Sequence, residues 1–265
     1  GVKGERLKTI KLRGQLSQGL LMPLSEACGN IESELFEGLD VTFPLNVRKW
    51  EKPVNAQLAG VCKGNFPTLI PKTDQERVQN LKNEIAAAQG VVFEVTEKLE
   101  GSSMTCYKIE GEFGVCSRNM DLKRDENNSF WKVAIEQDVE GKMSFSDNFA
   151  IQGELIGPGI QGNIYKLSKL EFYVFDVYDI QAGAYITPEM RRAIISGMNL
   201  NHVPLIAHSA QLFDSLGISD IDGVLKLAEG KSVLGNTERE GIVFKELNGG
   251  FTFKAISNKY LLGEK

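Results

Sequence analysis

The stretch Thr96-Glu97-Lys98-Leu99-Glu100-Gly101-Ser102-Ser103-Met104-Thr105 decides the fold of this chain, because it marks the point where a strand ends in a tight turn. The preceding run, Val-Val-Phe-Glu-Val at 91–95, has the apolar character that predicts a strand. Lys98 stands at the end of that strand, with Gly101 shortly behind it. A glycine lets backbone amides approach a ligand closely, so the turn would bring an ammonium group to a ligand site.

Lys98 allows two interpretations. A lysine that is partly desolvated and lies beside a metal ion or another cation can lose its proton and attack phosphorus. The alternative is a solvated lysine in a hairpin, and so short a motif does not decide between the two. The rest of the chain has to decide.

Composition and charge exclude several classes of protein. The chain has 265 residues, of which 42% are hydrophobic, enough for one large domain or two small ones. Its 30 basic and 35 acidic residues are intermixed without a basic block, so bulk charge does not indicate nucleic-acid binding. No signal peptide and no long apolar run is present, so we expect a soluble protein with no membrane partner.

The cysteines and histidines do not suggest a metal centre. Cys28, Cys62, Cys106 and Cys116 form no C-x-x-C pair, and their spacing suits neither zinc nor a disulfide scaffold. Reduced cysteines are typical of the cytoplasm or nucleus, where we expect the protein to be. His202 and His208 are far in sequence from other ligand types, which argues against a metal role for them.

The order of elements predicts an α+β domain whose sheets are mostly antiparallel and flanked by helices. A capping box at 73–76 predicts a helix that continues to Gly90, with Arg77 in its first turn. Hairpins are expected over 104–118 and 240–256, and strands over 149–156 and 171–178. Further helices are expected over 129–136, 187–197, 210–216 and 221–229.

Six elements then follow in a fixed order: Lys98, Arg118, Glu154, the strand that contains Phe175, Glu240 and Lys254. This order resembles the covalent nucleotidyltransferase superfamily of polynucleotide ligases and RNA capping enzymes. The lysine turn resembles the K-x-D-G nucleophile motif of that superfamily, and the other five resemble its later motifs. One K-x-x-G motif is weak evidence, whereas six elements in order are strong evidence.

Within the superfamily the chain is most similar to ATP-dependent RNA ligases of the phage type-two and editing-ligase kind. The segments 153–161 and 172–176 are typical of that branch. The segment 71–79 resembles a subgroup in which an OB domain precedes the catalytic domain. The resemblance implies an ATP-grasp-like nucleotidyltransferase domain over 24–265, with 1–23 as a junction after an N-terminal OB domain that the chain lacks.

The chain departs from the family pattern at two positions. Glu100 stands where the nucleophile motif usually has Asp, which keeps the charge and lengthens its reach. Ile256 stands where the last motif usually has a second lysine, and on a strand it would share a face with Lys254. One phosphate contact is therefore missing, or it is supplied by Lys259 or Lys245.

The resemblance implies a role for each site residue. Lys98 would attack the α-phosphorus of ATP, and Phe175 would stack on adenine while Glu97 contacts its amino edge. The other implied ATP-binding residues are Arg77, Gly101, Arg118, Glu154, Glu240, Lys245 and Lys254. Glu100, Glu154 and Glu240 would hold Mg²⁺ or Mn²⁺, largely through water.

The implied partners are ATP and RNA with 5′-phosphate and 3′-OH ends, bound by a monomer. Three alternatives stay open: a DNA ligase, a GTP-using capping enzyme, and a non-catalytic nucleotide or RNA sensor. The intact Lys98 argues against the sensor. The short tail after Lys254 would be unusual for a capping enzyme.

Overall fold

The computed structural model describes residues 60–144 and 146–263, together with residues 10–12, 15–17, 23, 25–26, 36–39, 41–42 and 45. The chain divides into two compact units, Gly1–Pro53 and Val54–Lys265. In the first unit, β1 (Ile10–Leu12) pairs antiparallel with β2 (Gln15–Ser17). The predicted junction over 1–23 falls mostly on residues outside the described part, as does Cys28.

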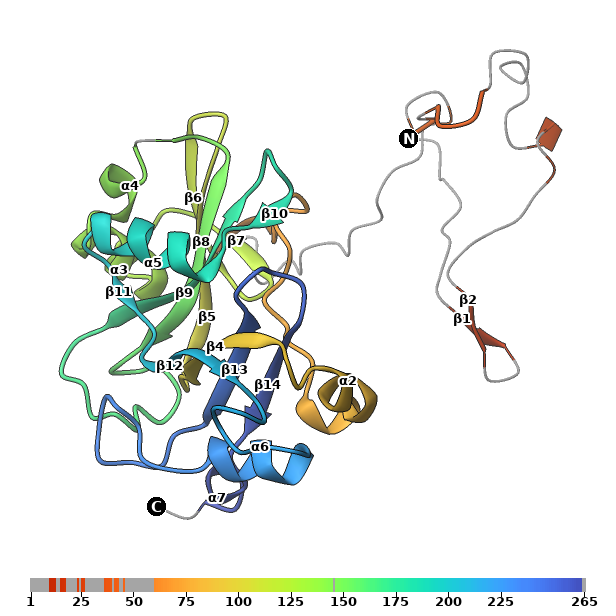
Figure 1. The fold of residues 1–265 in the computed structure, drawn as a ribbon. Helices are drawn as coiled ribbons and strands as arrows, with labels where there is room; N and C mark the ends of the chain where they lie inside the picture. The colour runs from red at the N-terminus through yellow and green to blue at the C-terminus, as the bar shows by residue number, and fades with distance from the viewer. Residues whose placement is uncertain are drawn as a thin grey trace. The chain divides into compact units, whose positions relative to one another are not determined.

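The described strands of the second unit form two sheets (Figure 1). The larger sheet has eight strands in the order β10-β9-β8-β5-β6-β7-β3, with β11 paired to β9. Every neighbouring pair in it is antiparallel except β11 with β9. Its strands are β3 (Cys62–Asn65), β5 (Ser102–Ile109), β6 (Glu112–Ser117), β7 (Met120–Leu122), β8 (Phe149–Ile156), β9 (Glu171–Asp179), β10 (Ala184–Tyr185) and β11 (Asn201–His202).

The smaller sheet has four antiparallel strands in the order β12-β4-β13-β14. These are β4 (Val92–Lys98), β12 (Leu205–Gln211), β13 (Gly241–Glu246) and β14 (Thr252–Ile256). In the register of β4 with β13, Gly241 lies opposite Lys98, so Glu240 is brought beside the lysine. A Cβ on Gly241 would lie 2.1 Å from the Ala255 carbonyl oxygen, which explains why this position is a glycine.

Each sheet packs against its own helices. The larger sheet packs against α3 (Ser129–Glu136) and α5 (Pro188–Gly197), and α4 (Val139–Lys142) packs against α3. The smaller sheet packs against the 3₁₀ helix η3 (Val78–Asn80) and α6 (Ile221–Ala228), and α2 (Lys82–Ala87) follows η3. The short α7 (Asn258–Leu261) follows β14.

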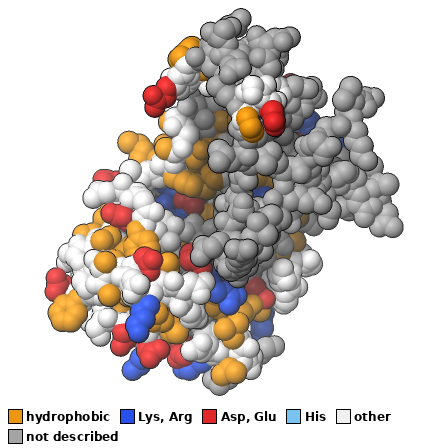
Figure 2. All heavy atoms as spheres, turned by 90° about the vertical axis from the view of Figure 1, so that its right-hand side faces the viewer, with side chains coloured by type: hydrophobic (Ala, Val, Ile, Leu, Met, Phe, Trp, Pro, Cys, Tyr) orange, Lys and Arg blue, Asp and Glu red, His pale blue; other side chains and the backbone are white. Residues whose placement is uncertain are grey.

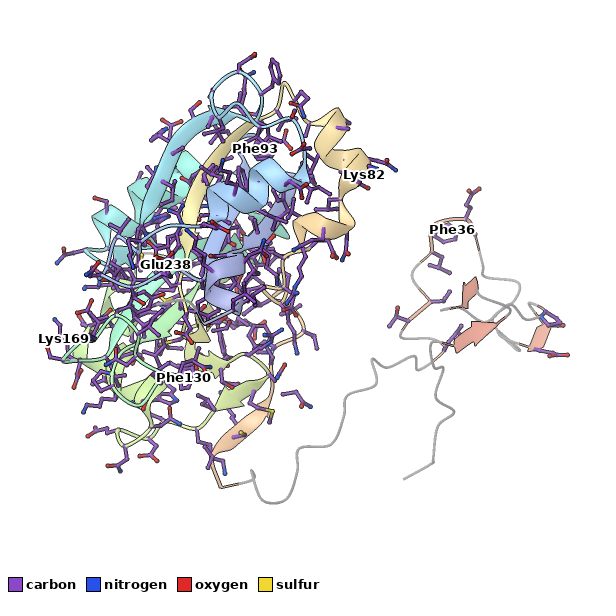
Figure 3. The ribbon with its side chains drawn as sticks, turned by 90° about the horizontal axis from the view of Figure 1, so that it is seen from below. Phe36, Lys82, Phe93, Phe130, Lys169 and Glu238 are labelled. Atoms are coloured by element: carbon purple, nitrogen blue, oxygen red, sulfur yellow. The ribbon has the colours of Figure 1, made fainter. Side chains whose placement is uncertain are left out.

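The two largest of the four apolar clusters among the described residues result from this packing. The core under the larger sheet contains Met104, Trp131 and Phe172, all buried. The core under the smaller sheet is aromatic: Phe93 meets Phe244 edge to face, with ring centroids 5.8 Å apart. Figure 3 shows Phe93 inside the unit and Lys82 at its outer edge on α2. Because Phe93 belongs to β4, this core fixes the strand that ends at Lys98.

Most of the predicted elements are confirmed, and with them the α+β class. The hairpins over 104–118 and 240–256, the strands over 149–156 and 171–178, and the helices over 129–136, 187–197 and 221–229 are all present. Asn128 caps α3, with its side-chain oxygen accepting a hydrogen bond from the Phe130 amide at 2.9 Å. These elements have clear turn or cap signals at their ends, which is why local patterns suffice.

The predicted helix over 73–90 is confirmed only in its second part, as η3 and α2, and the predicted helix over 210–216 is wrong. The chain stays extended through Arg77, and only then do η3 and α2 form, so Arg77 lies before the helical turn and not inside it. Thr73 and Asp74 do not cap a helix; their side chains contact Ser103 and Arg118. The segment 210–216 is the end of β12 and a turn, because pairing with β4 overrides the local helical pattern.

The surface of the described residues is mixed in charge. On the face shown in Figure 2, acidic and basic side chains lie among one another. Among the described residues, none of the helices is both long and apolar enough to cross a lipid bilayer.

Candidate active site

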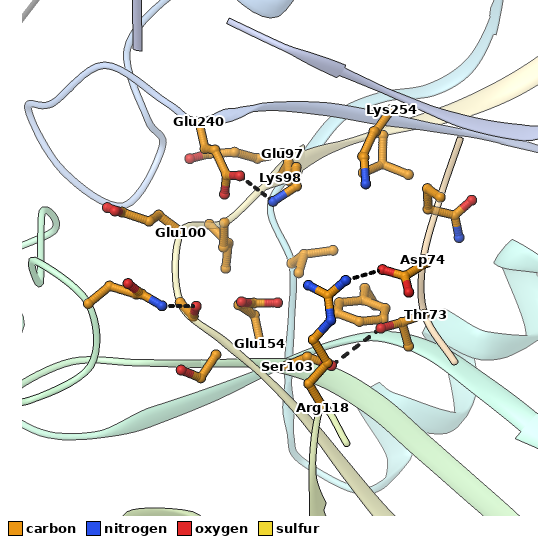
Figure 4. A pocket seen from close by; sticks show the side chains of 18 of the residues that line it. Thr73, Asp74, Glu97, Lys98, Glu100, Ser103, Arg118, Glu154, Glu240 and Lys254 are labelled. Atoms are coloured by element: carbon orange, nitrogen blue, oxygen red, sulfur yellow. Dashed lines mark hydrogen bonds and ion pairs between the residues drawn. The ribbon is translucent and has the colours of Figure 1, made fainter. Parts of the chain in front are cut away.

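A cavity of about 600 Å³ lies between the two sheets, with Lys98 on its wall (Figure 4). A volume of this size suits a ligand as large as a nucleotide. Every predicted site residue except Arg77 contributes to its lining. Those residues are Glu97, Lys98, Glu100, Gly101, Arg118, Glu154, Phe175, Glu240, Lys245 and Lys254.

Lys98 is the last residue of β4, and its side chain points into the cavity from the strand end. Its Nζ lies 2.5 Å from Oε1 of Glu240, and the two side chains are only 26% and 17% exposed. The carboxylate therefore holds the ammonium group in one place inside a partly desolvated site. This placement favours a reactive lysine over a solvated one.

The turn after Lys98 packs tightly against β8. A Cβ on Gly101 would lie 2.4 Å from the carbonyl oxygen of Leu155, so no other residue fits without moving the backbone. The Glu100 amide donates a hydrogen bond to the Tyr165 hydroxyl at 2.6 Å, and the Gln161 amide group donates to the Gly101 carbonyl at 3.3 Å. The loop that follows β8 thus holds the nucleophile turn in position.

Glu154 and Glu240 carry charges that act on Lys98, and Glu100 lies in the turn that follows the lysine. Burial raises the pKa of Glu154 to about 8; Lys98 and Arg118 oppose this shift and Glu240 adds to it. The Oε2 atom of Glu100 is buried and has no hydrogen-bond partner. Both features fit a cation, because a bound cation would stabilise the Glu154 carboxylate and satisfy the Glu100 oxygen.

The three carboxylates do not form a closed metal cage. Among the described residues, no group of three or more His, Cys, Asp or Glu side chains is close enough to hold a metal ion by itself. An ion held here would also need ligands from water or from a bound molecule, which is usual for Mg²⁺. The assignment of Glu100, Glu154 and Glu240 to a metal stays a prediction.

The aromatic end of the cavity is shaped by an irregularity in β9. In the pairing of β8 with β9, Gln152 lies opposite Asp176 and Gly153 opposite Val174, so Phe175 is the extra residue of a β-bulge. A bulge redirects a side chain and leaves local backbone groups unpaired. Lys245 fills that gap, because its Nζ donates to the Phe175 carbonyl oxygen at 2.7 Å and lies 5.4 Å from the centre of the Phe175 ring.

Glu97 precedes Lys98 on β4, lines the same cavity and is buried. Its Oε2 accepts a hydrogen bond from the Val233 amide at 2.9 Å, whereas its Oε1 has no partner. Burial raises the pKa of Glu97, and hydrogen bonds from Ser232 and Val233 together with the charge of Arg239 oppose the shift. A buried acceptor without a donor suits a ligand amino group.

Cations gather at the other end of the cavity. The pKa of Lys254 is lowered by burial and, in part, by the nearby charges of Lys98, Arg77 and Arg118. Arg118 is exposed and pairs with Asp74 at 2.5 Å. Arg77 is outside the cavity lining, but its backbone pairs with that of Lys254, so it lies next to this group. Crowded cations of this kind favour an anionic ligand.

The structure also bears on the missing second lysine of the last motif. Lys245 is 6% exposed and its Nζ lies 2.6 Å from Oδ1 of Asp176, so the ammonium group is already neutralised. Lys259 pairs with Glu229 at 3.5 Å and does not line the cavity. In this conformation, therefore, neither lysine supplies an unpaired charge next to Lys254.

Several lining residues were missed by sequence reasoning. They are Thr73, Asp74, Gln75, Asn119, Gln161, Val203, Val243 and Tyr260, among others. The pattern at 73–75 was available but indicated a helix cap. Tyr260 has no motif, yet its hydroxyl hydrogen-bonds to Glu100, which together with burial raises the pKa of the phenol.

A strand-end lysine between two antiparallel sheets, with carboxylates and cations around it, is the arrangement of a nucleotidyltransferase-type enzyme. The family model described as RNA ligase matches residues 91–256, which include nearly all of the site. The solved structure of Naegleria gruberi RNA ligase with PPi is 43% identical, with a TM-score of 0.71 over 98% of this chain and 76% of that one. The chain belongs to the RNA ligase family.

Other structures of the Naegleria gruberi enzyme agree. A mutant with ATP and Mn is 42% identical and has a TM-score of 0.72 over 98% of this chain and 77% of that one. A mutant without ligand is 43% identical and has a TM-score of 0.73 over 98% of this chain and 76% of that one. The family and the nucleotidyltransferase-type fold are thus confirmed. Among curated proteins, no relative matches the chain.

Proposed function

We propose that this chain is an ATP-dependent RNA ligase that uses Lys98 as its nucleophile. The observation that supports the proposal most strongly is the Lys98 ammonium group, held 2.5 Å from Glu240 inside the cavity of an RNA ligase fold. Solved structures of mutants of the Naegleria gruberi relative contain AMP and Mn or ATP and Mn, which supports ATP and a divalent metal as ligands here.

Three transfers make up the reaction. Nζ of Lys98, after losing its proton, attacks the α-phosphorus of ATP; an N–P bond forms and pyrophosphate leaves. An oxygen of the RNA 5′-phosphate then displaces the lysine from AMP. Finally the RNA 3′-OH attacks the activated 5′-phosphate, the new phosphodiester forms and AMP leaves. Phosphoryl transfer of this kind depends mainly on in-line positioning and on neutralised oxygens.

The site residues supply that positioning. Phe175 offers a flat face to the adenine, and the free Oε1 of Glu97 can accept a hydrogen bond from its amino group. Lys254, with Arg77 beside it, would hold phosphate oxygens, and Arg118 would exchange Asp74 for an anionic ligand. Lys245 would act from beneath Phe175 and not on phosphate, because Asp176 already pairs with it.

Glu154 and Glu240, with Glu100, would hold the metal ion. When bound, Mg²⁺ or Mn²⁺ neutralises phosphate charge and disfavours the ammonium form of Lys98. Until a cation is bound, Glu240 keeps Lys98 in place, and Glu154 stays largely protonated near neutral pH because of its raised pKa.

Some predictions concern features outside the site. We propose that residues 24–265 form the catalytic domain, that an OB domain assists RNA binding, and that the enzyme acts as a monomer. We also propose a cytoplasmic or nuclear location, supported by the free thiols of Cys62, Cys106 and Cys116 in the described part of the chain. The RNA ligase family favours this function over a DNA ligase, a capping enzyme or a sensor.

The test is covalent self-labelling. Incubated with metal and with ATP or GTP labelled at the α-phosphate, the protein should retain label from ATP through denaturation, and far less from GTP. Mass spectrometry should locate one adenylate on Lys98, and Lys98→Ala should abolish labelling. Lys108→Ala, which changes a lysine that pairs with Asp147 outside the cavity, is the matched control. Equal labelling of Lys98→Ala and the parent protein would disprove the proposal.

A further inference from the structure

A cluster of five charged residues adjoins the cavity through Lys245, and its other four members have no place in the proposed reaction. This buried ion cluster consists of Glu94 of β4, Asp176 of β9, Arg191 and Arg192 of α5, and Lys245 of β13. It therefore joins a strand of the larger sheet, two strands of the smaller sheet and a helix. Except for Arg192, which is partly exposed, its members are buried.

Arg191 occupies the centre of the buried ion cluster. Its guanidinium group binds the Glu94 carboxylate, and its Nη1 lies 3.5 Å from Oδ1 of Asp176. Its Nε donates a hydrogen bond to Nε2 of His202 at 3.2 Å. Burial and the charge of Arg191 lower the pKa of His202 to about 4, so this histidine is neutral and adds no charge. Arg191 is 1% exposed, so these contacts are fully desolvated.

The contacts of Arg191 lead to the base-binding end of the cavity. The carboxylate of Asp176 that it approaches also holds Lys245, with Nζ 2.6 Å from Oδ1. Lys245 in turn donates to the carbonyl oxygen of the bulged Phe175 at 2.7 Å. On its other side Arg191 is bound to Glu94, which lies on the strand that ends at Lys98. One side chain therefore links the Phe175 ring to the nucleophile strand.

We propose that Arg191 is a positioning residue that fixes the Phe175 ring relative to Lys98, and so sets the affinity for the base of the nucleotide. The inference rests on the proposed function, since it assumes that Phe175 stacks on adenine. Without Arg191, Asp176 keeps Lys245 as its partner but loses the connection to Glu94. The bulge is then free to shift, and the ring with it.

Arg192 provides a matched control for this inference. It is the neighbouring residue on α5, has the same charge and binds the same Glu94 carboxylate, but no ion pair joins it to Asp176 among the described residues. It also forms a hydrogen bond with His208. If α5 merely anchors the fold through Glu94, changing either arginine should have the same effect. If the link to Asp176 matters, only substitution of Arg191 should lower the affinity for the base of the nucleotide.

The experiment compares Arg191→Met, Arg191→Lys and Arg192→Met in the full chain. The rate of self-adenylation is measured in single turnovers over a range of ATP concentrations. For Arg191→Met we expect the half-saturating ATP concentration to rise about tenfold, as for a loss of base stacking, with the limiting rate changed less than about threefold. Arg191→Lys should recover part of the affinity, and Arg192→Met should stay within about threefold of the parent.

Inorganic tripolyphosphate separates base positioning from a general loss of structure. It competes for the phosphate end of the cavity but has no base, so its inhibition constant should be the same for Arg191→Met and the parent within about twofold. An equal loss of affinity for tripolyphosphate and ATP would overturn the proposal, as would equal effects of Arg191→Met and Arg192→Met. If Arg191→Met does not fold, Arg191→Lys decides, and an unchanged ATP affinity for it would overturn the proposal. Failure of the parent protein to label at all would instead refute the proposed function.

Discussion

Glu154 shows how burial and nearby charge act in opposite directions on one residue. Burial raises its pKa from an ordinary value of 4.5 to about 8, although Lys98 and Arg118 both oppose the shift. Desolvation of a carboxylate outweighs two nearby cations here because those cations are themselves partly neutralised by Glu240 and Asp74. The neutral acid is thus the stable form in the free enzyme near neutral pH.

The raised pKa predicts a pH-dependent stability. Between about pH 4.5 and 8 the native state holds a proton on Glu154 that the unfolded state releases, so the contribution of this group to the free energy of unfolding falls as pH rises. The slope from this one group is at most about 1.4 kcal/mol per pH unit. Glu154→Gln should remove that slope, measured by urea denaturation at several pH values in this window.

Glu112→Gln, at an exposed position on β6, is the control and should keep the parent slope. Identical pH dependence in Glu154→Gln and the parent would show that Glu154 is not protonated in the native state.

The bulge in β9 shows how one extra residue changes which side chains of a strand share a face. Strand alternation alone would place Phe175 and Tyr173 on one face, with Asp176 on the other. The bulge breaks that alternation where the strand reaches the cavity, and Lys245 fills the unpaired backbone position that results. Asp176 therefore meets Lys245, the residue that also holds the Phe175 carbonyl oxygen, while Phe175 lines the cavity and Phe172 is buried in the core.

Phe175→Leu should weaken ATP binding by about 1–3 kcal/mol, the range found for base–aromatic stacking. Leucine keeps much of the apolar volume, so the change tests the flat ring more than the packing. The matched control is Phe172→Leu on the same strand, which should lower the melting temperature and leave ATP binding intact. Isothermal titration with ATP measures the affinity. Normal ATP binding by folded Phe175→Leu would assign Phe175 to the core instead.

The helices and strands that local patterns predicted correctly have turn or cap residues at their own ends. The Asn248-Gly249-Gly250 turn places β13 against β14, and Asn128 starts α3. The predicted helix from Thr73 begins only at Val78, because the segment before it pairs with β14 through Arg77 and Lys254 and so stays extended. A helical pattern in the sequence reflects only residues a few positions apart, so it cannot show that β14, far along the chain, will pair with this segment.

The whole molecule brings together what the sequence separates. Lys98 ends β4, Glu154 lies in β8 and Glu240 directly precedes β13, and their family motifs made them predictable in advance. The buried ion cluster has no such motif: Glu94 and Lys245 are far apart in sequence, and the resemblance gave Lys245 a role in ATP binding but not in an ion cluster. The one local signal was Glu94, a charged residue inside the apolar run 91–95, where an unpaired carboxylate would be costly.

At this scale the prediction concerns the metal ion, since its proposed ligands meet only in the folded chain. Self-adenylation should fall to background in EDTA and return when excess Mn²⁺ or Mg²⁺ is added. The reason is that the buried Oε2 of Glu100 has no hydrogen-bond partner and that burial disfavours the Glu154 carboxylate, and a bound cation would relieve both. Labelling is measured before and after the metal is restored, with the melting temperature as the control for folding. Undiminished labelling in chelator would remove the metal from the mechanism.

The hairpin of β5 and β6 has a practical consequence for anyone who wishes to attach a reporter to this enzyme. β5 begins at Ser102 on the cavity wall and ends at Ile109, so at about 3.3 Å per residue its far end lies roughly 23 Å away. The connecting residues Glu110 and Gly111 are exposed and have positive φ angles of 51° and 84°. Exposed turns tolerate inserted peptides well. A fluorophore or a surface tether attached at this turn would therefore lie far from the cavity and would not block the binding of ligands there.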